Sequence, residues 1–196
     1  QSTYAQHALG RVRVTPGTIS NVGIDSLPIA DSAWYGTWPY DPESKYSGYD
    51  QIFGPEADST IDFGKKYPPS DYSWVVVDGL ADGKVNGNLP AGEKVSFAGK
   101  RIFVPSDRKA EFSLGSDDGV QVFLDGAQVF ENRIDRGASP DQDQLTLDLT
   151  AGEHTLIVKI VNTGGAGGYY WNSQAADSVL VGSTVFSLVD AAMPGM

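Results

Sequence analysis

The sequence contains no cysteine and only two histidines, which excludes several kinds of chemistry. Without cysteine there is no disulfide, no thiolate metal site and no cysteine nucleophile. Only His7 and His154 would act as bases near neutral pH. No nucleophile elbow, phosphate-binding loop or His-Glu-x-x-His helix is present. A glycosidase pair would have to come from acids such as Glu56, Glu111 and Glu131, which sequence alone cannot pair. We therefore expect no catalytic residues and no self-contained enzyme.

Long hydrophobic runs and basic residues are also scarce. No stretch approaches the roughly 18–20 apolar residues that cross a bilayer, so we expect no membrane insertion. The chain has 14 basic and 25 acidic residues and a formal net charge of -11. Such a charge repels nucleic acid, which we exclude as a partner. Of the acidic residues, 19 are aspartate, a residue that favours turns and binds hard cations such as calcium.

Glycine and proline are abundant instead, with 23 glycines and 11 prolines among 196 residues. This composition favours many strands joined by tight turns over long helices. The length suits one all-β domain. We predict a single module over residues 1–196, an all-β protein of two packed antiparallel sheets with less than about 10% helix.

The chain falls into three regions. Residues 1–33 hold a short β-like run at Arg11–Thr15 and a polar remainder, which we interpret as an N-terminal strand and lead-in. Residues 34–72 are rich in aromatic residues and proline without helical periodicity, which predicts an ordered surface loop region. Residues 73–196 would form the main sandwich. The strands expected there are Ser73–Asp78, Lys94–Val104, Ala110–Gly115, Val120–Leu124, Gln144–Leu149, His154–Val161, Gly168–Asn172 and Ser178–Val189.

Two local patterns support these strands. Leu145, Leu147 and Leu149 alternate with polar residues, as in a strand with one buried face. The dipeptide Asp125-Gly126 predicts a tight hairpin, because both central turn positions require a positive φ angle.

A more specific pattern covers roughly residues 95–172. Residues 114–126 read Leu-Gly-Ser-Asp-Asp-Gly-Val-Gln-Val-Phe-Leu-Asp-Gly, and residues 151–162 read Ala-Gly-Glu-His-Thr-Leu-Ile-Val-Lys-Ile-Val-Asn. A glycine-rich loop and Tyr169-Tyr170-Trp171 follow. In order and spacing these motifs resemble the protective-antigen-type β-sandwich of yeast flocculins and adhesins, β-glucosidase inserts and many secreted bacterial proteins. The resemblance implies a jelly-roll-like antiparallel β-sandwich.

In the adhesin branch, the resemblance also implies a calcium-dependent sugar site. Two successive aspartates joined by a cis peptide bond bind the ion there, together with an asparagine and backbone carbonyls of a later loop. Carried over to this sequence, the aspartates are Asp117 and Asp118, the asparagine is Asn162, and the carbonyl donors lie near Gly164 and Ala166. Sugar hydroxyls would complete the calcium shell, so both aspartates would also contact carbohydrate.

Alternatives remain open at both candidate sites. Residues Ser116–Gly119 also form a typical turn sequence, and the loop Thr163–Gly168 lacks the aromatic residue that the adhesins carry there. The aromatic residues of Trp34–Tyr49 would either stack on sugar rings or plug one end of the sandwich, and we favour the plug for most of them. Trp38 and Tyr40 are expected to be an exposed pair that contacts carbohydrate.

The sequence thus leads to two functions of different classes. The first is a non-catalytic, calcium-dependent carbohydrate-binding module of a secreted bacterial protein, such as an adhesin, at the cell surface or outside the cell. Its partner would be a polysaccharide or a cell-surface glycan, and it would belong to a larger multidomain protein. The second is a structural or protein-interaction domain of an exported protein or hydrolase, without sugar binding. The start at Gln1 fits either a mature product or a trimmed piece.

Overall fold

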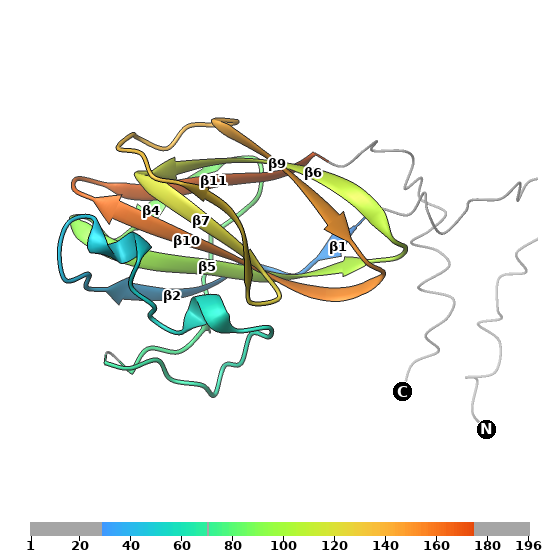
Figure 1. Cartoon of the computed structure of the whole chain (residues 1–196), viewed down its shortest axis with the longest axis horizontal. Helices are drawn as coiled ribbons and strands as arrows, with labels where there is room; N and C mark the ends of the chain where they lie inside the picture. The colour runs from blue at the N-terminus through green and yellow to red at the C-terminus, as the bar shows by residue number, and fades with distance from the viewer. Residues whose placement is uncertain (1–28, 70, 175–196) are drawn as a thin grey trace, which may run out of the picture.

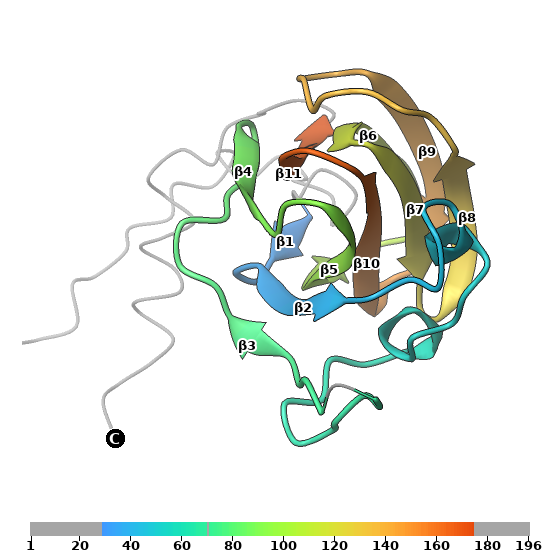
Figure 2. The ribbon, with the colours of Figure 1, turned by 90° about the vertical axis from the view of Figure 1, so that its left-hand side faces the viewer.

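Two antiparallel sheets make up the described part of the chain (Figure 1). The structure is a computed structural model that describes residues 29–69 and 71–174. The larger sheet has the order β3-β2-β5-β10-β7-β8, with β1 also paired to β5, and the smaller has the order β4-β11-β6-β9. Figure 2 shows the two sheets as two layers. The strands are β1 Ala30–Asp31, β2 Tyr35–Tyr40, β3 Val75–Val76, β4 Val85–Leu89, β5 Glu93–Val104, β6 Arg108–Asp117, β7 Gly119–Leu124, β8 Ala127–Asn132, β9 Asp143–Leu149, β10 Gly152–Thr163 and β11 Gly167–Gln174.

This architecture confirms the predicted all-β antiparallel sandwich. The only helical elements among the described residues are the short 3-10 turns η2 (Ser47–Tyr49) and η3 (Pro55–Ala57). None of the described segments forms a helix long and apolar enough to span a membrane. Strands β5, β6, β7, β9, β10 and β11 each contain a predicted strand and extend it at one or both ends. The predicted strands Arg11–Thr15 and Ser178–Val189 lie outside the described residues.

Three details of the prediction were wrong. The strand expected at Ser73–Asp78 is reduced to the two residues of β3, while β1 and β4 were not expected at all. Strand β2 lies in the region that we expected to be a loop. That expectation arose because its sequence contains a glycine and a proline, which disfavour strand interiors. A side chain at Gly36 would come within 2.0 Å of the Trp38 ring, so packing explains this glycine.

The main hydrophobic core lies between the two sheets. Leu145, Leu147 and Leu149 of β9 point into it, as their alternation predicted. Trp171 of β11 is fully buried and its ring lies 5.1 Å from that of Phe112 on β6. Burial of such large apolar side chains contributes about 1.5–3 kcal/mol each to folding.

A second core covers the opposite face of the seven-stranded sheet. Residues 41–69 and 71–74 cross this face and pack aromatic side chains against it. Tyr40 is fully buried, with its ring 5.3 Å from those of Phe53 and Phe97. Trp74 is also buried and donates a hydrogen bond of 2.8 Å to the Tyr67 hydroxyl. The loop region is therefore a packed layer. Trp34, Tyr40 and Tyr49 are buried as the plug predicted. Tyr46 is exposed, however, and the layer covers a face of the sheet rather than one end of the sandwich.

The predicted hairpin at Asp125-Gly126 is present, with φ angles of 52° and 80°. Asp125 also binds the start of β10: its Oδ2 atom lies 2.6 Å from His154 Nδ1, and its Oδ1 atom accepts the Thr155 amide at 2.8 Å. His154 Nε2 lies 2.8 Å from the Thr150 carbonyl oxygen. Burial lowers the pKa of His154, but the hydrogen bonds to Asp125 and Thr150 outweigh it and raise the pKa above its usual value.

The raised pKa predicts a pH-dependent contribution to stability. Because the folded state favours protonated His154, its contribution is complete below the unfolded pKa of about 6.5 and is lost as pH rises through the higher folded pKa. We expect His154→Gln to reduce the free energy of unfolding more at about pH 5.5 than at about pH 8.5. Urea denaturation at both pH values measures this difference. In an Asp125→Asn background the pH-dependent part should shrink, because only the Thr150 carbonyl would still favour the protonated ring, whereas an equal loss at both pH values in the parent protein would contradict the assignment.

Candidate metal and carbohydrate site

Four connections between the two sheets gather at one end of the sandwich. They are residues 90–92 between β4 and β5, Asp118 between β6 and β7, residues 133–142 between β8 and β9, and residues 164–166 between β10 and β11. Hydrogen bonds join them: the Gly92 amide donates to the Gly165 carbonyl at 2.8 Å, and the Arg136 amide donates to Asp118 Oδ1 at 2.8 Å. The expected proximity of the Asp117–Asp118 segment and the loop after Asn162 is therefore confirmed.

Asp118 has a structural role at this end. The peptide bond between Asp117 and Asp118 is cis. Asp118 is buried, and its Oδ2 atom accepts hydrogen bonds from the Thr163 amide at 2.9 Å and from the Thr163 hydroxyl at 2.6 Å. With the Arg136 amide on Oδ1, one carboxylate joins three of the connections. The next residue, Gly119, must lack a side chain, because a Cβ atom there would lie 1.8 Å from the Tyr49 hydroxyl.

Asp117 differs from its neighbour. Its side chain forms no hydrogen bond or ion pair with any of the residues that the structure describes, although it is partly buried. Burial and the charge of Asp118 raise the pKa of Asp117 above its usual value. The two adjacent carboxylates therefore carry negative charge that the described side chains leave partly uncompensated, as expected for a cation site.

Asn162 holds the loop that follows β10. The Asn162 side chain is buried, its Oδ1 atom accepts the Gly164 amide at 2.9 Å, and its Nδ2 atom donates to the Ala166 carbonyl at 2.9 Å. The carbonyl oxygens of Pro90 and Gly165 lie 3.3 and 3.5 Å from the same nitrogen. Several backbone oxygens thus surround one amide group at the end of β10.

These donors suit calcium in their chemistry, since calcium binds carboxylate, amide and carbonyl oxygens. Within residues 29–69 and 71–174 no three His, Asp or Glu side chains cluster as a metal-binding group, so an ion would need amide and backbone oxygens as well. Asp117 can offer its carboxylate in the observed arrangement. Asn162 directs its nitrogen toward the carbonyl of Ala166, so its amide would have to turn over to offer oxygen.

Other charged residues at this end were missed by the sequence analysis. Arg136 donates from its guanidinium group to Ser116 Oγ at 2.9 Å and to the Asp143 carboxylate. Asp135 accepts the Thr163 hydroxyl at 3.1 Å and the Tyr46 hydroxyl at 2.9 Å. These residues lie in a loop of mixed polar composition, which carries no motif that would have identified them.

The expected exposed aromatic pair is only half correct. Tyr40 is fully buried, so the prediction that it contacts carbohydrate was wrong: it faces the second core, where burial raises its pKa to about 12. Trp38 is partly exposed and lines a pocket of about 290 Å³ together with Thr37 and Tyr72. Strand β2 is separated from β7 by β5 and β10, so Trp38 and the aspartates belong to different places on the molecule.

No family model matches the chain, and no curated protein sequence matches it either. Solved structures do. A β-glucosidase from Kluyveromyces marxianus in complex with glucose shows 16% identity and a TM-score of 0.40, covering 71% of this chain and 22% of that one. A PA14 sugar-binding domain from an RTX adhesin shows 21% identity and a TM-score of 0.30, and the match covers 40% of this chain and 47% of that one. The PA14 domain of the antifreeze protein MpAFP shows 13% identity and a TM-score of 0.32, and the match covers 43% of this chain and 46% of that one.

The structural neighbours thus include PA14 domains, the protective-antigen-type module that the sequence resembles. The matches span less than half of each of the three neighbouring chains. The likeness is one of fold.

The contrast between the aspartates predicts different effects of the same substitution. Asp118→Asn should lower the free energy of unfolding by about 2–4 kcal/mol, because an amide replaces a carboxylate that accepts three hydrogen bonds. Asp117→Asn removes charge repulsion without breaking a bond to a described residue. In metal-free buffer this substitution should change the free energy of unfolding by no more than about 0.5 kcal/mol or should increase it. Chemical denaturation with a chelator present measures both, and equal losses would contradict the assigned roles.

Proposed function

We propose that the chain is a non-catalytic, calcium-dependent carbohydrate-binding module of a secreted bacterial protein. The observation that carries this proposal is the place of the Asp117 carboxylate, which lacks a partner among the described residues. It adjoins Asp118 at the end of the sandwich where the backbone oxygens around Asn162 also gather.

Each residue would have a distinct part in ion binding. Asp117 would supply a carboxylate that needs no rearrangement, and Asp118 would keep the three connections together while offering a remaining lone pair. Asn162 would supply its amide oxygen, with backbone oxygens near Gly164 and Ala166 completing the protein ligands. When bound, the calcium ion would offer open positions to a pair of sugar hydroxyls.

Trp38 would provide a second, independent contact. Its ring is partly exposed in a pocket that also contains Tyr72 and Ser73, so an aromatic surface and a hydroxyl group lie together there. Pockets of this kind combine apolar walls with a few polar groups that orient a ligand. A polysaccharide long enough to contact both places would bind more tightly than a single sugar.

Calcium should raise the melting temperature of the protein, because an ion that binds only the folded state stabilises it by mass action. At about 100 times its dissociation constant, the gain would be about 2.7 kcal/mol. Asp117→Ala should abolish this shift in a thermal-shift titration against a chelator. Asp148→Ala is the matched control, since Asp148 is an exposed aspartate on β9 paired only with exposed Lys109. An unchanged melting temperature of the parent protein would contradict the calcium site.

Sugar binding should separate the two places. On a glycan array, Asp117→Ala should abolish retention together with the calcium shift, whereas Trp38→Ala should weaken retention by about tenfold and leave the calcium shift intact. Retention that persists in excess chelator would place the ligand away from the aspartates. No retention under any condition would instead favour the structural or protein-interaction domain.

A further inference from the structure

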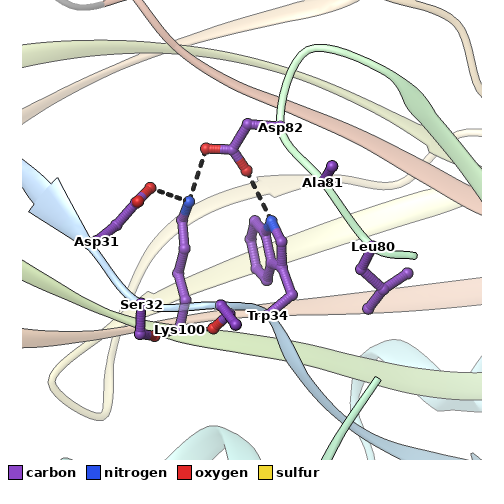
Figure 3. Close-up of a pocket in the computed structure, with 8 residues that line it drawn as sticks. Asp31, Ser32, Trp34, Leu80, Ala81, Asp82 and Lys100 are labelled. Carbon is purple, nitrogen blue, oxygen red and sulfur yellow. Dashed lines mark hydrogen bonds and ion pairs between the residues drawn. The ribbon is translucent and has the colours of Figure 1, made fainter. Parts of the chain in front are cut away.

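A buried lysine on β5 lies between two carboxylates, beside β1 and the connection before β4 (Figure 3). The Lys100 side chain on β5 is only 3% exposed. Its Nζ atom forms ion pairs with Asp31 on β1 and with Asp82 in the connection before β4, the latter at 2.6 Å. Asp31 is paired in register with Ile102, so the two strands hold the amine and the Asp31 carboxylate close together.

The surroundings of this group are apolar on one side. The Trp34 ring lies 4.7 Å from Lys100 Nζ, and its Nε1 atom donates to Asp82 Oδ1 at 2.7 Å. Both oxygens of Asp82 are thus occupied, one by the indole and one by the amine, which fixes the carboxyl group. Asp31 is bound only through Oδ2 among the described contacts, and it borders a pocket of about 220 Å³.

We propose that Lys100 and Asp31 condense to an intramolecular amide bond, with Asp82 as the proton relay. The reaction starts from the ion pair: Asp82 accepts a proton from the Lys100 ammonium group, which leaves a free amine in contact with the Asp31 carboxylate. Lys100 Nζ attacks Asp31 Cγ, a C–N bond forms, one C–O bond of Asp31 breaks, and the oxygen leaves as water. Asp82 passes the proton that it accepted, and then a second one taken from the attacking nitrogen, to that oxygen, so both protons of the water come from Lys100, Asp82 ends as the carboxylate it was, and no oxidant or reductant is required.

Proximity is what allows this reaction to occur in a protein. Amide formation between separate molecules in water is unfavourable, but groups held in contact react with effective molarities of about 10⁵–10⁸ M. The pairing of β1 with β5 and the bond from Trp34 to Asp82 supply this fixed arrangement. The product would join the short strand β1 covalently to the centre of the larger sheet.

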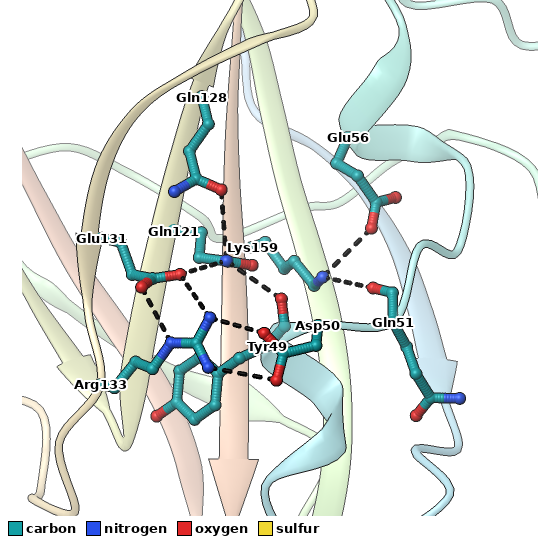
Figure 4. A network of polar contacts seen from close by, with 9 residues as sticks. All are labelled: Tyr49, Asp50, Gln51, Glu56, Gln121, Gln128, Glu131, Arg133 and Lys159. Carbon is teal, nitrogen blue, oxygen red and sulfur yellow. Dashed lines mark hydrogen bonds and ion pairs between the residues drawn. The ribbon is translucent and has the colours of Figure 1, made fainter.

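A second buried lysine in the same chain provides an internal control (Figure 4). Lys159 on β10 is 1% exposed, and its Nζ atom lies 3.1 Å from Glu56 Oε1 and 2.8 Å from the Gln51 carbonyl. The Glu56 carboxylate also accepts the backbone amides of Phe53 and Gly54, and no second carboxylate contacts Lys159 among the described residues. Without a proton relay, this pair should remain an ordinary ion pair.

The test is the intact mass of the full chain under denaturing conditions. The parent protein should weigh less than its sequence by one water molecule, and peptide mapping should find a branched peptide that joins Lys100 to Asp31. Peptides that contain Lys159 should be unmodified. A mass equal to that of the sequence would overturn the proposal.

Three variants assign the roles of the residues. Asp31→Asn should lose ammonia instead of water, because the amine would then attack an amide. Asp82→Ala should keep the full mass while circular dichroism still reports β-structure, since it removes the relay together with its hydrogen bond from Trp34. Lys100→Arg should also keep the full mass and melt roughly 10 °C lower, because the cross-link constrains the unfolded chain. A loss of water that persists in Asp31→Ala would overturn the assignment of Asp31.

Discussion

The pairing of β5 with β10 is the constraint on which the remaining structure depends. These strands pair in register from Gly152 opposite Val104 to Thr163 opposite Glu93, through the middle of the seven-stranded sheet. Both faces of β10 are covered, one by the smaller sheet and one by residues 41–69 and 71–74. Polar groups on these strands must therefore find partners inside the protein. The buried lysines Lys100 and Lys159 do so on opposite faces of the sheet.

The connections between the sheets meet the same constraint at one end. Backbone groups that leave a sheet lose their ladder partners and need others. Asp118 and Asn162 supply these partners for the connections around them, and the glycine-rich loop permits the φ angle of 81° at Gly165. The residues of the candidate calcium site are thus also residues that close the sandwich, which explains why Ser116–Gly119 has the sequence of a turn. Asp117 is the exception, since none of the described hydrogen bonds uses its carboxylate.

The sequence predicted well what depends on local pattern. The alternation of apolar and polar residues located β9. The dipeptide Asp125-Gly126 located the hairpin between β7 and β8, because few residues tolerate positive φ angles. It failed where tertiary packing decided. Strand β2 contains glycine and proline, yet it pairs with β5, where Tyr40 is fully buried and Tyr35 and Trp38 are partly buried. The same burial removes Tyr40 from the surface, and burial cannot be read from an aromatic cluster alone. The resemblance located Asp117 and Asp118, whereas Arg136 and Thr163 act through contacts that no motif records.

The strand directions also determine how the module would be oriented when another domain or a surface is attached to it. Strand β1 begins opposite Phe103 and β11 ends opposite Glu111, so the described chain enters and leaves at the end remote from Asp118. A surface, reporter or neighbouring domain attached directly before β1 or directly after β11 would therefore leave the four connections facing outward. Tension applied between the two attachments would load β1 and β11 first and would reach the candidate site only after those strands had separated from β5 and β6.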